Sequence, residues 1–429
     1  MNRHVLLLIT MGLSISLVLT GCSGGSESTS SDEDQVTLRM SWWGSQSRND
    51  MTLKIIDMYE AENPHVKIEP EFTGWDGYFE RMAAQAAGNN LPDIMQQNFG
   101  EYLNLYASQG LLTDLSSFIE DGTLDVSQVE DEILQTGEKD GELLGIPTGT
   151  NALTVAYNKE LLEEAGIDLP SNDWTWQDFK RLAEQVHSEL GIYGSGSLGI
   201  TNTFEYSLRE KGYTLFNENG TGLGYSDDQL LVDYLTFTKE LVDADVIPGL
   251  DVTQQIQGLE DDLLVHKNSP FAFVHSNQVL ALSSVADYSF DLNVLPGGQI
   301  DQGMYLKPSM LWSVSENSTQ KEEAVKFIDY FVNAQEVYDE SGSERGVPIN
   351  NEIRENMRSD LSEVEAKIFD YIEYVSENSS PIDTNFPTEA NEILMELEQL
   401  DERVMYGQVT PEEGAAQFRE VAEMLLGNE

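Results

Sequence analysis

The first regular pattern in the chain is an alternation of apolar and polar residues from Val36 to Trp43, which predicts a β-strand. Apolar residues then recur at helical spacing up to Asn63-Pro64, and Ser47 with Asp50 three positions later predicts the start of that helix. The same reading predicts a strand over residues 66–72, a helix over 77–87 and a short strand over 91–95. Strands and helices alternate, which is typical of a parallel sheet with helices on its faces.

A second set of elements follows the turn-rich break at 145–150. The pattern predicts strands over 152–157, 271–274 and 290–295, a helix over 159–165, and a helix that Thr175 and Asp178 begin as a capping box. From Glu322 onwards the chain reads as mostly helical, with breaks at 342–350 and 379–387. The length of 429 residues also favours two domains over one.

The N-terminal segment has a different composition from the rest. An apolar run from Val5 to Leu19 is shorter than the roughly 20 residues that a membrane-spanning helix needs, so residues 1–21 are predicted to be a signal peptide. Leu19-Thr20-Gly21-Cys22 resembles the bacterial lipobox, in which the cysteine is the lipidation site, and this is the chain's only cysteine. Residues 22–35 are rich in Ser and Gly and are expected to form a lipid-anchored flexible linker. We therefore expect contact with a membrane through a lipid on Cys22.

The charge of the chain is strongly negative. It has 23 Lys and Arg residues against 76 Asp and Glu residues, a formal net charge of −53. Nucleic acid and anionic headgroups would be repelled, so we expect no nucleic-acid partner. Because the acids are dispersed through amphipathic segments, we interpret them as a solvated surface and as an adaptation to a saline or alkaline exterior.

Motifs for catalysis and cofactor binding are missing from the sequence. There is no Gly-x-Ser-x-Gly, no phosphate-binding loop and no dinucleotide fingerprint, and the five histidines do not stand at metal-ligand spacing. We expect no cofactor and no metal. Paired carboxylates cannot be singled out among 76, so a glycosidase stays open at this point.

Tryptophans stand where predicted elements begin or end. Trp42, Trp43 and Trp75 lie beside predicted strand ends or helix starts. Sugar sites combine flat aromatic faces with polar hydrogen-bonding groups. Adjacent residues of a strand point to opposite faces, so two neighbouring tryptophans cannot both face one core. We expect one of Trp42 and Trp43 to face a crevice at the carboxyl ends of the strands.

Several motifs, in this order and spacing, resemble a known family. They are Cys22, Trp42-Trp43-Gly44, Trp75-Asp76-Gly77-Tyr78, Leu91-Pro92-Asp93-Ile94, Tyr157-Asn158-Lys159, Trp174-Thr175-Trp176, Gly297-Gly298 and Arg345-Gly346-Val347-Pro348. The chain resembles, over nearly all of residues 36–429, an extracellular solute-binding protein of the maltose-binding type, the lipoprotein receptor of an ABC carbohydrate importer. The resemblance implies an α/β, two-lobed periplasmic-binding-protein-like fold with crossing hinge strands and a ligand cleft between the lobes.

The resemblance also implies how the chain divides. The N-terminal lobe would comprise residues 36–149 plus 297–340, and the C-terminal lobe residues 150–296 plus 341–429. The crossings are expected near 147–152, near Pro296 and around 335–345.

The function implied by the resemblance is that of a receptor, without catalytic residues. It would capture a mono- or oligosaccharide and deliver it to ABC permease subunits, as a monomer on the outer face of the cell membrane. The positions matching the family's ligand contacts are Trp42, Trp43, Trp75, Gln97, Asn98, Tyr157, Phe204, Glu205, His275, Asn277, Trp312 and Arg345.

Two alternatives stay open: a surface-anchored carbohydrate-active enzyme, and a binder of a non-sugar solute. Acidic sugars would require a local cation such as Arg345. The segment 191–203 departs from many relatives because it has no tryptophan.

Overall fold

The computed structural model describes residues 35–168, 171–256 and 258–427. The predicted signal peptide, Cys22 and nearly all of the predicted linker lie outside the described residues. Residues Val36–Glu429 form one compact unit. Within the part of the chain that the structure describes, none of the helices combines the length and apolar character needed to cross a bilayer.

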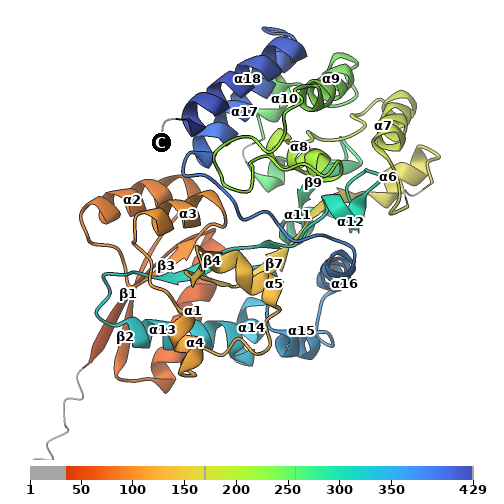
Figure 1. Cartoon of the computed structure of the whole chain (residues 1–429). Coiled ribbons are helices and arrows are strands. Elements are labelled where there is room, and N and C mark those ends of the chain that lie inside the picture. The colour runs from red at the N-terminus through yellow and green to blue at the C-terminus, as the bar shows by residue number, and fades with distance from the viewer. Residues whose placement is uncertain (1–34, 169–170, 257, 428–429) are drawn as a thin grey trace, which may run out of the picture. The chain divides into compact units, whose positions relative to one another are not determined.

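The first sheet has five strands in the order β2-β1-β3-β12-β6 (Figure 1). Its strands are β1 (Val36–Trp43), β2 (Val66–Thr73), β3 (Ile94–Gln97), β6 (Ile146–Pro147) and β12 (Leu311–Val314). β1 pairs in parallel with β2 and β3, whereas β12 runs antiparallel to β3 and β6. Helices α1 (Gln46–Glu62), α2 (Trp75–Ala87) and α3 (Glu101–Ser108) follow the three parallel strands. The predicted alternation of strands and helices is confirmed here.

One detail of the first helix differs from the prediction. Helix α1 is capped by Ser45, whose side chain accepts the backbone N–H of Arg48 at 3.2 Å, so Ser47 already lies inside the helix. Ser45 has the extended backbone that an N-cap requires, with φ −67° and ψ 169°.

The second sheet has three antiparallel strands in the order β10-β8-β9. They are β8 (Leu153–Tyr157), β9 (Phe271–His275) and β10 (Asp291–Asn293). The helices of this region are α6 (Lys159–Glu164), α7 (Trp176–Leu190), α8 (Ile200–Arg209), α9 (Gln229–Asp243) and α11 (Ser276–Val285). Thr175 and Asp178 form the predicted capping box at the start of α7.

Three short strands lie where the chain passes between these two sheets. They are β7 (Gly149–Asn151), β11 (Lys307–Pro308) and β13 (Val347–Pro348), in the order β11-β7-β13. The first falls where a crossing is predicted. The two strands that pair with β7 lie later in the chain than the crossings predicted near Pro296 and around 335–345, and these crossings stay predictions. The assignment of each segment to a lobe stays a prediction.

Glycine is required in β7. A Cβ atom on Gly149 would lie 2.4 Å from the carbonyl oxygen of Arg345, a separation that real Cβ atoms do not reach. The close approach of these two backbones therefore depends on the missing side chain.

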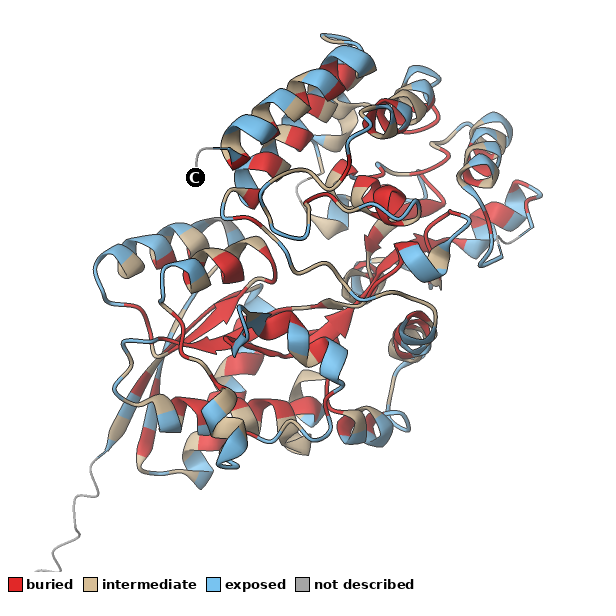
Figure 2. Ribbon diagram, in the orientation of Figure 1, coloured by how far each residue is buried: buried red, intermediate tan, exposed pale blue. Residues whose placement is uncertain are grey.

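The other elements are short connections and the C-terminal helices. The short ones are α4 (Ser116–Glu120), α5 (Asp131–Leu134), η1 (Gln135–Gly137), β4 (Glu138–Lys139), β5 (Glu142–Leu143), α10 (Leu250–Thr253), η2 (Leu259–Asp261) and α12 (Ile300–Gly303). The later helices are α13 (Lys321–Asn333), α14 (Gln335–Ser341), α15 (Asn351–Met357), α16 (Glu363–Glu377), α17 (Ala390–Met405) and α18 (Pro411–Leu426). Most strands are buried, although β2 exposes several residues, and helices expose one side, so the cores lie between the sheets and their helices (Figure 2).

Candidate functional site

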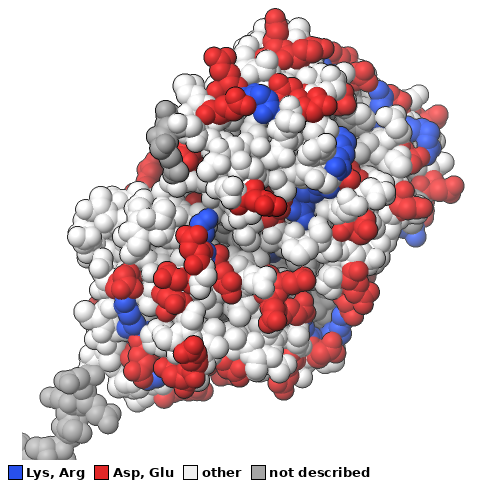
Figure 3. All heavy atoms as spheres, in the orientation of Figure 1, with Lys and Arg blue, Asp and Glu red and all other residues white. Residues whose placement is uncertain are grey.

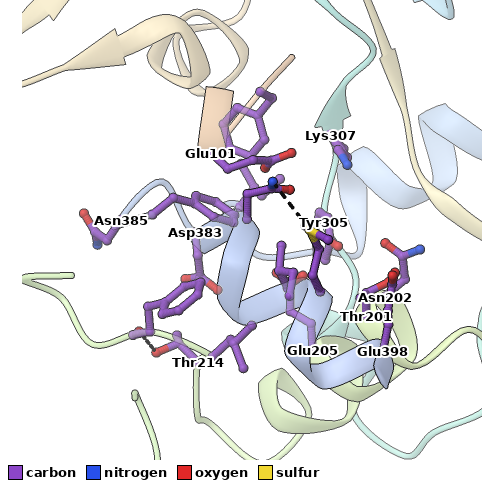
Figure 4. Close-up of a pocket in the computed structure, with 18 of the residues that line it drawn as sticks. Glu101, Thr201, Asn202, Glu205, Thr214, Tyr305, Lys307, Asp383, Asn385 and Glu398 are labelled. Carbon is purple, nitrogen blue, oxygen red and sulfur yellow. Dashed lines mark hydrogen bonds between the residues drawn. The ribbon is translucent and has the colours of Figure 1, made fainter. Parts of the chain in front are cut away.

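A cavity of about 510 Å³ lies between residues that follow the first sheet and residues of the second region (Figure 4). This volume falls in the range of roughly 300–1,000 Å³ that is usual for ligand pockets. Its lining comes from the turn after β3, from α8 and the loop after it, from the approach to β11, from the segment before α17 and from α17 itself. These residues are Phe99, Glu101, Thr201, Asn202, Glu205, Thr214, Leu215, Phe216, Glu218, Tyr305, Lys307, Ile382, Asp383, Asn385, Phe386, Asn391, Leu394, Met395 and Glu398.

Three phenylalanine rings form an apolar part of the wall. Phe386 meets Phe99 edge-on with ring centroids 5.7 Å apart, and it meets Phe216 with centroids 6.0 Å apart. Asn104 of α3 donates to the carbonyl oxygen of Phe386 at 2.9 Å. Phe386 thereby joins residues that follow β3 to residues that follow α8.

The segment 378–389, here called the connecting segment, runs from α16 to α17 and is anchored by Arg209 of α8. The buried Arg209 guanidinium forms a 2.6 Å ion pair with Asp383 and donates to Ser380 Oγ at 2.6 Å and to the carbonyl oxygen of Pro381 at 2.8 Å. It also lies over the ring of Tyr305, 4.9 Å from the centroid. Arg209 therefore fixes the part of the connecting segment that supplies Asp383 to the cavity.

Two half-buried carboxylates face the interior. Glu101 accepts a hydrogen bond from Asn98 Nδ2 at 2.9 Å, and burial raises its pKa. Burial raises the pKa of Glu205 to about 7, although the Arg209 charge opposes this shift. Burial, together with the neighbouring Glu205 carboxylate, also holds the pKa of the Tyr305 phenol well above its usual value. Carboxylates in this setting are strong acceptors for ligand hydroxyl groups.

We expect Glu205 to make folding stability depend on pH. Its pKa is about 7 in the folded chain against 4.5 for an unperturbed side chain, so the folded state binds this proton more tightly. This contribution to the free energy of unfolding is present below pH 4.5 and is lost as the pH rises through about 7. Urea unfolding between about pH 5 and 8 should show a steeper decline for the unaltered chain than for Glu205→Gln. Equal slopes in the two proteins would contradict this expectation.

The structure corrects the expectation for the paired tryptophans. Trp42 is fully buried and donates from Nε1 to Asn49 Oδ1 of α1 at 2.9 Å. Trp43 is also buried, in a separate core with Tyr78, where their ring centroids lie 5.1 Å apart. The two side chains do point to opposite faces, but each face of the sheet carries its own core, so neither tryptophan lines the cavity.

Five other predicted contacts are buried in cores and do not line the cavity either. They are Gln97, Tyr157, Phe204, Trp312 and Arg345. Arg345 illustrates the reason: its guanidinium donates to Gln96 Oε1 at 2.7 Å and to Thr52 Oγ1 at 2.8 Å, and it lies 5.2 Å from the Trp312 ring centroid. These hydrogen bonds hold the cation in the protein interior beside β3 and α1.

The remaining predicted contacts lie nearer to the cavity. Glu205 lines it. Asn98 does not line it but donates a hydrogen bond to the lining residue Glu101. His275 lines a second cavity of about 320 Å³, and Asn202 lines both cavities. Trp75 is 45% exposed and packs edge-on against Trp43, while Asn277 lies half-buried on α11. Of the five predicted residues in this group, which are Glu205, Asn98, His275, Trp75 and Asn277, Glu205 alone lines the cavity of about 510 Å³.

The sequence pattern does not predict most of the lining residues. Phe99 follows the predicted Gln97-Asn98 pair by one residue, so its neighbourhood is predicted although the residue is not. Lys307 begins the two-residue strand β11 and Tyr305 precedes it, while Phe386 lies in a segment that reads only as a helix break. Within the described residues, no group of three or more His, Cys, Asp or Glu side chains is arranged to hold a metal ion.

Comparison with protein families decides the class. The family model described as bacterial extracellular solute-binding protein matches residues 46–338. The chain belongs to this family. Its members are extracellular solute-binding proteins, and the similar solved structures share the two-lobed fold of this chain.

Individual relatives agree with the family assignment. An arabinooligosaccharide-binding protein of Bacillus subtilis is 21% identical over 255 residues, which are 58% of this chain and 57% of that protein. A family 1 extracellular solute-binding protein of Alicyclobacillus acidocaldarius has a structure with a TM-score of 0.72 and 29% identity, covering 92% of this chain and 100% of its own. An ABC substrate-binding protein of Listeria monocytogenes, solved with cycloalternan, has a TM-score of 0.80 at 22% identity, with coverage of 92% and 100%.

Proposed function

We propose that this solute-binding protein captures a mono- or oligosaccharide in the cavity between its two lobes and delivers it to the permease of an ABC importer. The arrangement of the cavity wall carries the proposal. The rings of Phe99, Phe216 and Phe386 offer apolar faces, and Glu101 and Glu205 offer acceptors for hydroxyl groups. Sugar rings need this combination of apolar and polar contacts.

The distribution of the lining supports capture by closure of the lobes. Phe99 and Glu101 follow the first sheet, Glu205 and Phe216 belong to the second region, and Lys307 lies in a strand between the two sheets. A ligand that touches both sides stabilises the closed arrangement relative to the open one. The closed, loaded form is the one that a permease would recognise.

The site of action follows from the N-terminal sequence and the charge. A lipid on Cys22 would hold a monomeric receptor on the outer face of the cell membrane, with residues 22–35 as a linker. Acidic side chains are spread over the face that Figure 3 shows, with fewer basic ones between them. This surface supports work in a saline or alkaline exterior.

Calorimetric titration of Val36–Glu429, the compact unit, with neutral mono- and oligosaccharides tests the function. We expect saturable binding, with the ligand recovered intact. Phe386→Ala should weaken binding about fivefold, because one aromatic contact contributes roughly 1 kcal/mol. Tyr406→Ala, on an exposed residue outside the cavity, is the matched control and should bind normally.

Two outcomes would contradict the proposal. Heat release with a cleaved product would favour a carbohydrate-active enzyme, since Glu205, with its raised pKa, has the property of a general acid. Equal affinity of Phe386→Ala and the unaltered chain would place the ligand elsewhere.

A further inference from the structure

The charged side chains of the cavity wall are unequally distributed by sign. Five carboxylates line it, from Glu101, Glu205, Glu218, Asp383 and Glu398. Among the described residues that line the cavity, Lys307 alone carries a positive charge (Figure 4). Glu218 and Glu398 are exposed at its mouth, whereas Glu101 and Glu205 are half-buried inside.

The two interior carboxylates lack direct cationic partners. Asp383 is neutralised by Arg209 at 2.6 Å. In the described part of the chain, neither Glu101 nor Glu205 forms a salt bridge, and Lys307 acts on both only through its field. Two interior carboxylates therefore face one ammonium group in the cavity wall, and the Arg209 charge that also acts on Glu205 is already paired with Asp383. Their unused acceptor capacity faces the space that a ligand would fill.

The arginine that an acidic ligand would need is not available. Arg345 is buried, and both terminal nitrogens of its guanidinium donate hydrogen bonds, to Gln96 and to Thr52. Arg48, whose charge acts on Arg345, pairs with Glu344 at 2.9 Å. An anionic group in the cavity would meet two carboxylates for each cation, in a setting where water screens charges poorly.

We propose that the cavity selects its saccharide by charge: it takes neutral and amino sugars and discriminates against sugar acids, with Glu101 and Glu205 as the residues that set this preference. This inference rests on the proposed function. Ligand hydroxyl and ammonium groups donate to these two carboxylates in charge-assisted hydrogen bonds. A uronate would place its carboxylate, a hydrogen-bond acceptor, beside the acceptors Glu101 and Glu205. The ligand carboxylate would then be left unpaired beside like charges.

A matched disaccharide series tests this selection. Calorimetric titration would use one skeleton in three forms, with a hydroxyl, an amino or a carboxylate group at the same end, at one fixed ionic strength because salt screens charges. We expect the amino form to bind at least as tightly as the neutral form, and the acidic form to bind about tenfold more weakly or worse. A sugar acid that binds within about threefold of the neutral form, or a loss of affinity on adding the amino group, would overturn the inference.

Variants identify the residues responsible. Glu205→Gln and Glu101→Gln keep the shape of the side chain but remove its charge, and each should reduce the ratio of neutral to acidic affinity. Glu392→Gln, on the exposed face of α17 outside the cavity, should leave the ratio unchanged. An unchanged ratio in Glu205→Gln and Glu101→Gln would overturn the role of these residues. Failure of all three saccharides to bind would overturn the proposed function as well, whereas tight binding with the acidic form preferred would overturn this inference alone.

Discussion

Replacing Arg209 with Met is expected to lower the free energy of unfolding by about 3 kcal/mol, because it leaves the buried partners of a charge without their donor. The guanidinium serves Asp383, Ser380 and the carbonyl oxygen of Pro381 at the same time, and its side chain is only 5% exposed. Methionine preserves the length of the side chain but donates no hydrogen bond. Urea unfolding of Val36–Glu429 in molar salt measures the loss.

A surface arginine provides the matched control. Arg358 pairs with Asp370 at 2.9 Å and also with Glu373, but its side chain is 35% exposed. Exposed ion pairs contribute about 0–1 kcal/mol, so Arg358→Met should unfold nearly as the unaltered chain does. Equal losses in the two variants would refute the anchoring role of Arg209. Because the connecting segment supplies Asp383 and Phe386 to the cavity, Arg209→Met should also weaken saccharide binding.

Local patterns were sufficient to predict most elements of the fold. The alternation in β1 and the Thr175 capping box each depend on residues within a few positions, and both are confirmed. The N-cap of α1 lies two residues before the predicted Ser47. Ser45 and Ser47 offer the same hydroxyl, and only the backbone conformation distinguishes them. Long-range pairing was harder to predict. The two residues of β11 are too few to show a period, so the sequence does not predict that they pair with β7.

The sequence predicted the region of the site but few of its residues. The carboxyl end of β3 was expected to contribute, and Phe99 and Glu101 follow it closely. The loop at 214–218 and the connecting segment bring their residues into the cavity only through tertiary contacts such as those of Arg209 and Asn104. Sequence periodicity does not predict such tertiary contacts. The chemical type of a residue was also an unreliable guide, because Arg345 was predicted to contact the ligand and is instead buried in a core.

The second prediction with a large expected effect concerns the contribution of Trp42 to the free energy of unfolding. Trp42→Ala should lower the free energy of unfolding by about 3–5 kcal/mol, because a fully buried aromatic side chain is removed and the surrounding core collapses only in part. The indole also donates to Asn49 Oδ1 at 2.9 Å, and that acceptor would lose its partner. Thermal and urea unfolding, followed by circular dichroism, measure the change.

Trp75 is the control that separates core packing from a role at the surface. Its side chain is 45% exposed, and its ring meets Phe79 edge-on with centroids 4.9 Å apart. Its replacement by Ala should cost about 1 kcal/mol or less, since nearly half of its surface is already in water. A large loss from Trp75→Ala together with a small one from Trp42→Ala would reverse the burial described for the two residues. The expected order would instead explain why adjacent tryptophans end β1: a sheet with a core on each face has a place for both Trp42 and Trp43.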